Sequence, residues 1–319
     1  MKSLRYVLLV ALGLMLALGL TLVSCDKPVD SGPEVSTLHR GLSVDPESVD
    51  PHKSRSVQAA DVLRDIGEGL LSYSASGELV GGVAKEWTVA EDGLTYTFHL
   101  RDDARWSNGD AVTAEDFAFS FRRLVDPDTA AFYAEMLGSI VNVHAIVAGG
   151  KAPQDIGVDA LDERTLVITL DQPTPYLLSL LAYPSTFPVH PGSIAQYGDA
   201  FTRPGNLLSN GAYKLDTWQP GSVLTLSRNE YYWNNDETAI DAVNHHVLIQ
   251  EMAELNRYRA GEIHVTGSVP PDSLQQIRSE RPAELHIAPS LGVYYYGFNL
   301  TKPPFKDNPQ LRAALSMAV

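Results

Sequence analysis

The feature that most constrains this chain is an uncharged, largely apolar run from Tyr6 to Val23, which follows Lys2 and Arg5 and precedes Cys25. A basic start, an apolar middle and small residues before a cleavage point are the pattern of a secretory signal. Because Cys25 is the only cysteine, no disulfide can form within the chain. We therefore expect an exported protein that folds without a covalent cross-link.

The position of Cys25 favours one of three interpretations. A cysteine directly after such a run resembles the lipobox of bacterial lipoproteins, where it is diacylated and becomes the first mature residue. The alternatives are a single membrane anchor, since the run of 18 residues is near the minimum for a spanning helix, and an inert buried thiol. We predict a lipoprotein signal peptide at residues 1–24 and a flexible, lipid-anchored tether at residues 25–35. Asp26 resembles the signal that retains some lipoproteins in the inner membrane of Gram-negative bacteria.

The charge of the chain argues against nucleic acid as a partner. Removing residues 1–24 takes away two positive charges and no negative one, so the net charge changes from −15 to −17. Such an acidic surface repels phosphate backbones. The mature part is long enough for two domains with hydrophobic cores.

Strand-like runs and helix patterns alternate along the chain. Thr113 is the expected N-cap of a helix, with Asp116 three residues later as in a capping box, and Asn108-Gly109 predicts a turn. This mixture predicts an α/β fold with mixed sheets. The expected strands lie at 94–100, 165–170, 212–215, 223–226, 244–249 and 293–299, and the expected helices at 113–124, 175–181, 252–260 and from 311 onward.

The helix pattern at Leu311–Val319, which begins near Asp307-Asn308-Pro309, has no C-cap before the sequence ends. We therefore expect this sequence to be a fragment of a longer protein.

No signature of an enzyme is found in the sequence. Serine-hydrolase, zinc-protease, phosphate-loop and dinucleotide motifs are absent. His245 and His246 are adjacent in an expected strand, so their side chains should lie on opposite faces, one in the core and one at the surface. The paired acids at 91–92 and 102–103 are expected in solvated turns. We predict no metal site, no cofactor and no catalytic activity.

Ten short motifs, taken together and in order, carry a resemblance to a known family. From about Leu42 onward the chain resembles the solute-binding subunits of bacterial peptide importers, extracellular solute-binding protein family 5, and among them the oligopeptide-binding proteins. The motifs are 48–52 (SVDPH), 67–71 (GEGLL), 83–87 (VAKEW), 92–101 (DGLTYTFHLR), 106–109 (WSNG), 112–117 (VTAEDF), 210–213 (NGAY), 228–233 (RNxxYW), 257–263 (RYRAGEI) and 304–307 (PFxD).

The resemblance implies a periplasmic-binding-protein clam-shell of three domains, of which this chain is roughly the first three fifths. An extended peptide would lie in the cleft between two lobes and be held mainly through its backbone. A monomeric protein of the cell envelope would then deliver the peptide to an ABC permease with its ATPase subunits. The implied domains are 36–67 with 193–290, an inserted second domain at 68–192, and the truncated start of a third at 291–319.

The resemblance also implies which residues contact the ligand. Well-known members carry an acid where Arg55 stands, so the reversed charge should disfavour lysine-rich peptides. Ser268 replaces an asparagine of the family. The aligned positions are Arg55, Ser56, Val57, Tyr133, Ser268 and Tyr295.

Three alternatives to peptide import stay open. The same fold carries dipeptides, murein peptides, nickel chelates or sugars in relatives. A non-transport peptide sensor or adhesin on this fold is a second alternative. An exported peptide hydrolase is a third, although no activated nucleophile or metal set supports it.

Overall fold

The computed structural model describes residues 35–288 and 292–318. The chain divides into two compact units, Met1–Val269 and Pro270–Val319. The predicted signal peptide, Cys25 and all of the tether except its last residue lie outside the described residues. Within the described ranges, no helix is both long enough and apolar enough to cross a bilayer.

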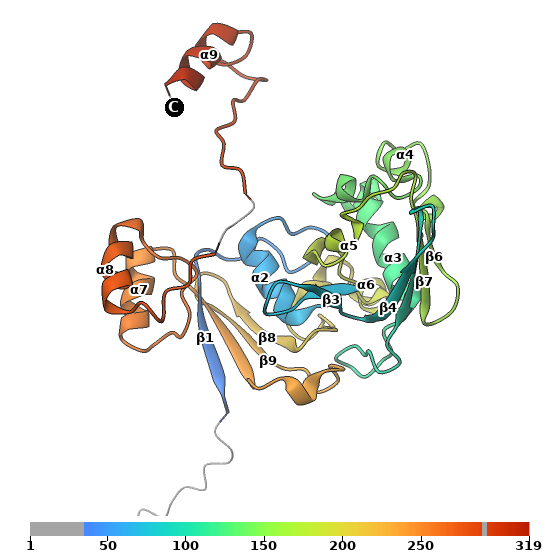
Figure 1. The fold of residues 1–319 in the computed structure, drawn as a ribbon, viewed down its shortest axis with the longest axis horizontal. Coiled ribbons are helices and arrows are strands. Elements are labelled where there is room, and N and C mark those ends of the chain that lie inside the picture. The colour runs from blue at the N-terminus through green and yellow to red at the C-terminus, as the bar shows by residue number, and fades with distance from the viewer. Residues whose placement is uncertain (1–34, 289–291, 319) are drawn as a thin grey trace, which may run out of the picture. The chain divides into compact units, whose positions relative to one another are not determined.

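Strands of the first unit form two four-stranded sheets and a hairpin (Figure 1). Among the strands of the described residues, β1 and β10 pair in parallel and the other strand pairs are antiparallel. The first sheet has the order β1 (Thr37–Leu42), β10 (Ala242–Val247), β9 (Val223–Arg228), β8 (Tyr213–Gln219). The second sheet has the order β4 (Ala84–Val89), β5 (Thr95–Leu100), β7 (Thr165–Thr169), β6 (Val158–Ala160), and the hairpin is β2 (Leu71–Tyr73) with β3 (Leu79–Gly81).

Helices connect and cover these sheets. Those of the first unit are α2 (Val57–Ile66), α3 (Ala114–Val125), α4 (Val143–Val147), α5 (Leu177–Leu180), α6 (Pro191–Tyr197) and α7 (Glu251–Arg259), and those of the second unit are α8 (Leu274–Glu280) and α9 (Pro309–Met317). Short 3-10 turns lie at Pro127–Thr129, Ala134–Leu137, Pro153–Asp155, Pro184–Thr186, Gly198–Thr202, Asn235–Glu237 and Pro271–Ser273.

The predicted α/β class with mixed sheets is confirmed, and the local signals that supported it act as expected. Thr113 caps α3: its hydroxyl accepts from the N–H of Asp116 at 3.2 Å, and the Asp116 carboxylate accepts from the N–H of Thr113 at 2.9 Å. Gly109 has a φ of +91°, a value suited to glycine in the Asn-Gly turn. The strands predicted at 94–100, 165–170 and 244–249 are β5, β7 and β10.

The expected strand at 293–299 is wrong, because residues 292–299 have no regular secondary structure. Aromatic residues favour strands only where a neighbouring strand can pair with them and bury one face. Among the described residues no strand pairs with this segment. The helix predicted from 311 is α9, whose N-cap Asn308 accepts from the N–H of Leu311 at 3.1 Å.

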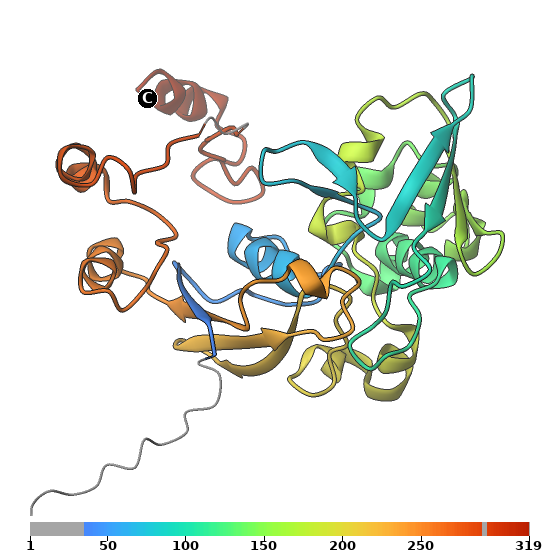
Figure 2. The ribbon, with the colours of Figure 1, turned by 60° about the horizontal axis from the view of Figure 1, so that its bottom comes forward.

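The described part of the first unit contains two separate hydrophobic clusters. Figure 2 shows α2 beside the first sheet. The cluster between them includes Val62, Leu63, Ile66, Leu224, Leu226 and Val243. The other lies between α3 and the second sheet, and includes Phe98, Phe117, Phe121, Leu124, Leu166 and Ile168. All buried members of the second cluster fall between residues 70 and 182. Members of the first come from residues 42–66 and 215–243.

A buried ionic cluster fixes the loop between β1 and α2 to helix α3. Arg123 donates to both carboxylate oxygens of Asp50 and lies 2.7 Å from Nδ1 of His52. Burial would raise the pKa of Asp50, but the hydrogen bond from Arg123 holds it below its ordinary value. Burial lowers the pKa of His52 to about 4, so this imidazole is neutral near pH 7.

A second buried carboxyl, that of Glu68, links the segment between α2 and β2 to the segment after β9. Glu68 accepts hydrogen bonds from the Tyr232 hydroxyl and the Trp233 indole, both at 2.7 Å. The guanidinium of Arg101 lies 3.6 Å from the ring centroid of Trp233. Burial raises the pKa of Glu68 to about 7. These contacts give the 67–71 and 228–233 motifs a structural role.

Candidate ligand-binding site

The backbone before α2 is held by one side chain, Glu47. Its carboxylate accepts from the backbone N–H of Arg55, from the N–H of Ser56 at 2.9 Å and from the Ser56 hydroxyl. Ser56 is also the N-cap of α2, since its Oγ accepts from the N–H of Ala59 at 3.1 Å. Burial would raise the pKa of Glu47, but the Ser56 hydroxyl and the backbone N–H groups hold it below its ordinary value.

Tyr133 brings a distant segment to this loop. Its hydroxyl donates to the carbonyl of Arg55 at 3.4 Å, across 78 residues of sequence. Its ring makes edge-to-face contacts with Phe132 and Tyr183, with centroids 4.9 and 5.7 Å apart. The guanidinium of Arg55 lies 5.7 Å from the centroid of Phe132. Arg55 and Tyr133, chosen as ligand contacts from the family resemblance, are therefore neighbours in space.

This surface is apolar, aromatic and cationic. Val57 is 70% exposed and Phe132 is 60% exposed. Within the described ranges, the guanidinium of Arg55 has no carboxylate within ion-pair distance. Burial and a hydrogen bond with Tyr133 raise the pKa of Tyr183, so the Tyr183 phenol is neutral near pH 7. The surface can contact apolar groups and attract an anion.

Ser268 lies at the carboxyl end of the parallel strands β1 and β10. The segment before it runs beside β1, where the carbonyl of Val265 accepts from the N–H of Gly41 at 2.8 Å. Its hydroxyl donates to Glu251 of α7 at 3.1 Å. In the described part of the chain, no hydrogen bond joins it to Arg55 or Tyr133. The carboxyl ends of parallel strands are a frequent place for ligands in α/β proteins.

Tyr295 lies in the second unit, in the irregular segment that was expected to be a strand. Its side chain is 78% exposed. The structure therefore brings Arg55, Ser56, Val57 and Tyr133 into one neighbourhood, and it assigns Tyr295 to a different compact unit.

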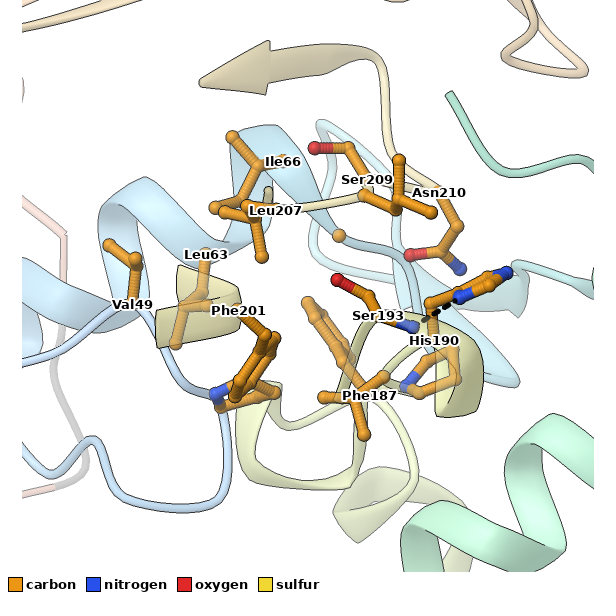
Figure 3. Close-up of a pocket in the computed structure, with 15 residues that line it drawn as sticks. Val49, Leu63, Ile66, Phe187, His190, Ser193, Phe201, Leu207, Ser209 and Asn210 are labelled. Atoms are coloured by element: carbon orange, nitrogen blue, oxygen red, sulfur yellow. Dashed lines mark hydrogen bonds between the residues drawn. The ribbon is translucent and has the colours of Figure 1, made fainter. Parts of the chain in front are cut away.

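A small cavity lies within the first unit, and it is too small for a peptide. Its volume is about 20 Å³, enough for about one water molecule. Figure 3 shows Phe187 near its centre and the hydrogen bond from the Ser193 N–H to Nδ1 of His190, which is 3.0 Å long. The lining combines residues near α2 with residues 187–190 and 207–210. The cavity is therefore not a candidate site for a peptide.

The two adjacent histidines are arranged as predicted. His245 is fully buried and its Nε2 lies 2.8 Å from the Asp65 carboxylate of α2. His246 is on the opposite face and partly exposed, and its Nε2 lies 2.9 Å from Nδ1 of His39. Among residues 35–288 and 292–318, no group of histidines, cysteines or acids has the geometry of a metal site.

Sequence reasoning missed three members of this surface: Glu47, Phe132 and Tyr183. Phe132 precedes Tyr133 directly, so the adjacent aromatic pair was a usable signal. Glu47 is eight residues from Arg55 and no motif links them. Tyr183 packs on Tyr133 only through the fold of the chain.

Comparison with known proteins identifies the family. Residues 78–319 match the model of the bacterial extracellular solute-binding proteins, family 5 Middle. The chain belongs to this family. The family and its members are solute-binding proteins and not enzymes, as predicted here.

Individual relatives differ in the solutes that they are named for. The chain is 41% identical to the periplasmic oligopeptide-binding protein OppA of Escherichia coli K12 over 317 residues, covering 98% of this chain and 58% of OppA. It is 40% identical to a probable deoxycholate-binding periplasmic protein, YgiS, of the same organism, covering 86% of this chain and 51% of YgiS. The solved structure of the E. coli murein tripeptide binding protein MppA superimposes with a TM-score of 0.86 at 39% identity, covering 90% of this chain and 56% of that one. The chain thus spans a little over half the length of the relatives it matches.

Proposed function

We propose that this chain is the N-terminal part of an extracytoplasmic solute-binding protein that captures oligopeptides and delivers them to an ABC permease with its ATPase subunits. The observation that carries the proposal is the contact between the Arg55 carbonyl and the Tyr133 hydroxyl. The Arg55 carbonyl, a main-chain acceptor, thereby lies beside an exposed aromatic surface. A peptide can be held there by main-chain hydrogen bonds whatever its side chains are.

The proposed protein is a monomer of the cell envelope, tethered by lipid on Cys25. Its first lobe consists of residues 36–67 with 193–290 and the inserted domain 68–192, and a third domain begins at 291. The two separate hydrophobic clusters support a boundary near residues 67 and 192. Ser268 and Tyr295 are the proposed ligand contacts outside the Arg55 surface. Closure of the two lobes would bury the ligand, and reopening would release it.

Isothermal titration tests this function. The complete protein, produced without its signal peptide, should bind peptides of two to ten residues from a mixed library. Peptide backbones should dominate, so peptides of equal length and different sequence should bind with similar affinity. Indifference to every peptide would overturn the proposal. Cleavage of labelled peptides during the same incubation would instead support an exported hydrolase.

A second cargo class has a specific observation in its favour. The Arg55 guanidinium lies next to Phe132 and Tyr133 and has no carboxylate partner among the described residues. This combination suits an organic acid whose carboxylate is attached to an apolar group. The likeness to a probable deoxycholate-binding protein supports the same class. Mass spectrometry of ligand that co-purifies with the protein separates the two: a peptide supports import of peptides, and an organic acid supports the alternative. A neighbouring permease gene would favour transport over sensing.

A further inference from the structure

One carboxylate receives three donors from two consecutive residues of the proposed ligand surface. Glu47 accepts from the N–H groups of Arg55 and Ser56 and from the Ser56 hydroxyl. Hydrogen bonds to a charged acceptor are stronger than those between neutral groups. The low pKa of Glu47 keeps it ionised near pH 7. The conformation of the backbone before α2 is therefore set by a residue eight positions earlier.

The same bonds decide which backbone groups a ligand can use. The N–H groups of Arg55 and Ser56 already have a partner in Glu47, and the carbonyl of Ser56 accepts from Ala60 at 3.1 Å. The carbonyl of Arg55 has only the 3.4 Å bond from Tyr133 in the described part of the chain. That bond is longer than an ordinary O–H···O bond, so a second donor can share this oxygen. The Arg55 carbonyl is thus the acceptor that this segment offers.

Glu47 leaves the charge of Arg55 available. The carboxylate contacts the backbone of Arg55, whereas the guanidinium lies over Phe132. Within the described ranges no ion pair joins Glu47 to Arg55. Glu47 therefore orders residues 55–56 without neutralising the Arg55 guanidinium.

We infer that Glu47 is a positioning residue, which holds the Arg55 carbonyl toward an N–H donor of the ligand and the Arg55 guanidinium beside it. The inference rests on the proposed function for the identity of the donor, an amide N–H of a peptide. The ordering of residues 55–56 by Glu47 does not depend on that function. The two parts can therefore be tested separately.

Hydrogen exchange of the free protein tests the ordering. Glu47→Ala should raise the exchange rates of the Arg55 and Ser56 amides about tenfold or more, because both lose a charged acceptor. Glu47→Gln should restore part of the protection, since its amide oxygen still accepts. Glu91→Ala, which removes an equal charge from an exposed turn, is the matched control and should leave these amides unchanged. Equal exchange in Glu47→Ala and the wild type would overturn the inference.

Peptide titration of the same variants tests the role in binding. Glu47→Ala should weaken binding of Ala-Glu-Ala at least severalfold, Glu47→Gln should recover most of the affinity, and the melting temperatures should stay close together. Faster exchange with unchanged affinity would overturn the positioning role while leaving the ordering intact. If the wild-type protein binds no peptide and exchange still rises in Glu47→Ala, the proposed function fails and the structural part of the inference holds.

Discussion

Arg123 donates from its two terminal nitrogens to the two carboxylate oxygens of Asp50, at 2.9 and 2.6 Å. The side chains are 12% and 4% exposed. A buried pair of this kind is held by geometry that satisfies both charges, and loss of one partner leaves an uncompensated buried charge. The pair anchors the loop that carries Glu47 and Arg55 to α3, so it fixes part of the candidate site to that helix.

Asp50→Asn should therefore be strongly destabilising. The amide has nearly the same size but cannot neutralise Arg123, and such a loss costs about 3–5 kcal/mol. Urea unfolding at pH 7 measures it. Glu115→Gln is the matched control, because it removes an acid from the pair with Arg122, in which Glu115 is 62% exposed. The control should cost about 1 kcal/mol or less. Equal losses in the two variants would contradict the assignment.

Local signals in the sequence predicted much of the fold. The alternation in β5 places Tyr96, Phe98 and Leu100 in the core, because a strand with one buried face must repeat every two residues. Thr113 and Asp116 are three residues apart and satisfy each other within one helical turn. Such features depend on neighbours in sequence, so a sequence displays them directly.

The contacts that build the site depend on chain topology instead. Asp50 and Arg123 are 73 residues apart, and Arg55 and Tyr133 are 78 apart. No periodicity links them, and the neighbourhood of Arg55 and Tyr133 could be predicted only through the family resemblance. The segment 293–299 failed for a related reason: its aromatic residues predict a strand, but a strand needs a partner that local sequence cannot supply.

The neutral state of His52 predicts a loss of stability in acid. Burial lowers its folded pKa from 6.5 to about 4, so the unfolded chain binds a proton that the folded chain resists. The free energy of unfolding should fall as the pH decreases from about 6.5 to about 4, by up to about 3 kcal/mol from this group. His52→Asn keeps an acceptor for Arg123 and cannot become charged, so its profile should be flatter. His144→Asn, at an exposed position, should follow the wild type. Parallel profiles for all three proteins would contradict this account.

Glu68 should affect stability in the opposite direction to His52: the free energy of unfolding should fall as the pH rises. Its folded pKa is raised from 4.5 to about 7, so the folded chain holds the proton more tightly. Stability from this group is greatest below about 4.5 and decreases as the pH rises to about 7, by up to about 3 kcal/mol. Glu68→Gln can still accept from Trp233 and donate to Tyr232. The variant should match or exceed wild-type stability above pH 7, and a clearly less stable variant there would mean that the ionised carboxylate is required.

Cys25 should carry lipid and be the first residue of the mature protein. Cys25→Ser removes the thiol that would be diacylated, so the variant should leave the membrane fraction or stay unprocessed. Fractionation and intact mass measure both outcomes. Ser24→Ala, which keeps a small residue before the cleavage point, should behave as the wild type. Unchanged fractionation and mass of Cys25→Ser would show that the run from Tyr6 to Val23 has another role.

Arg55 should bias the cargo toward acidic or neutral side chains. Its guanidinium is at the surface beside Phe132, and no carboxylate of the described residues pairs with it. An acidic ligand side chain gains about 0.5–1 kcal/mol from a solvent-accessible pair, which corresponds to a few-fold in affinity. Ala-Glu-Ala should therefore bind more tightly than Ala-Lys-Ala. The difference should shrink at high salt, since exposed charges are screened.

Reversal of the charge gives the sharpest test of this bias. Arg55→Glu should reverse the ranking of the two peptides, because a glutamate at this position repels the acidic side chain of Ala-Glu-Ala and attracts the basic side chain of Ala-Lys-Ala. Arg203→Glu makes the same change of net charge at an exposed position outside the candidate site, and it should keep the wild-type ranking. Titration at low ionic strength measures both variants. An identical ranking in Arg55→Glu and the wild type would show that Arg55 does not face the ligand, and the peptide must then contact the lobe elsewhere.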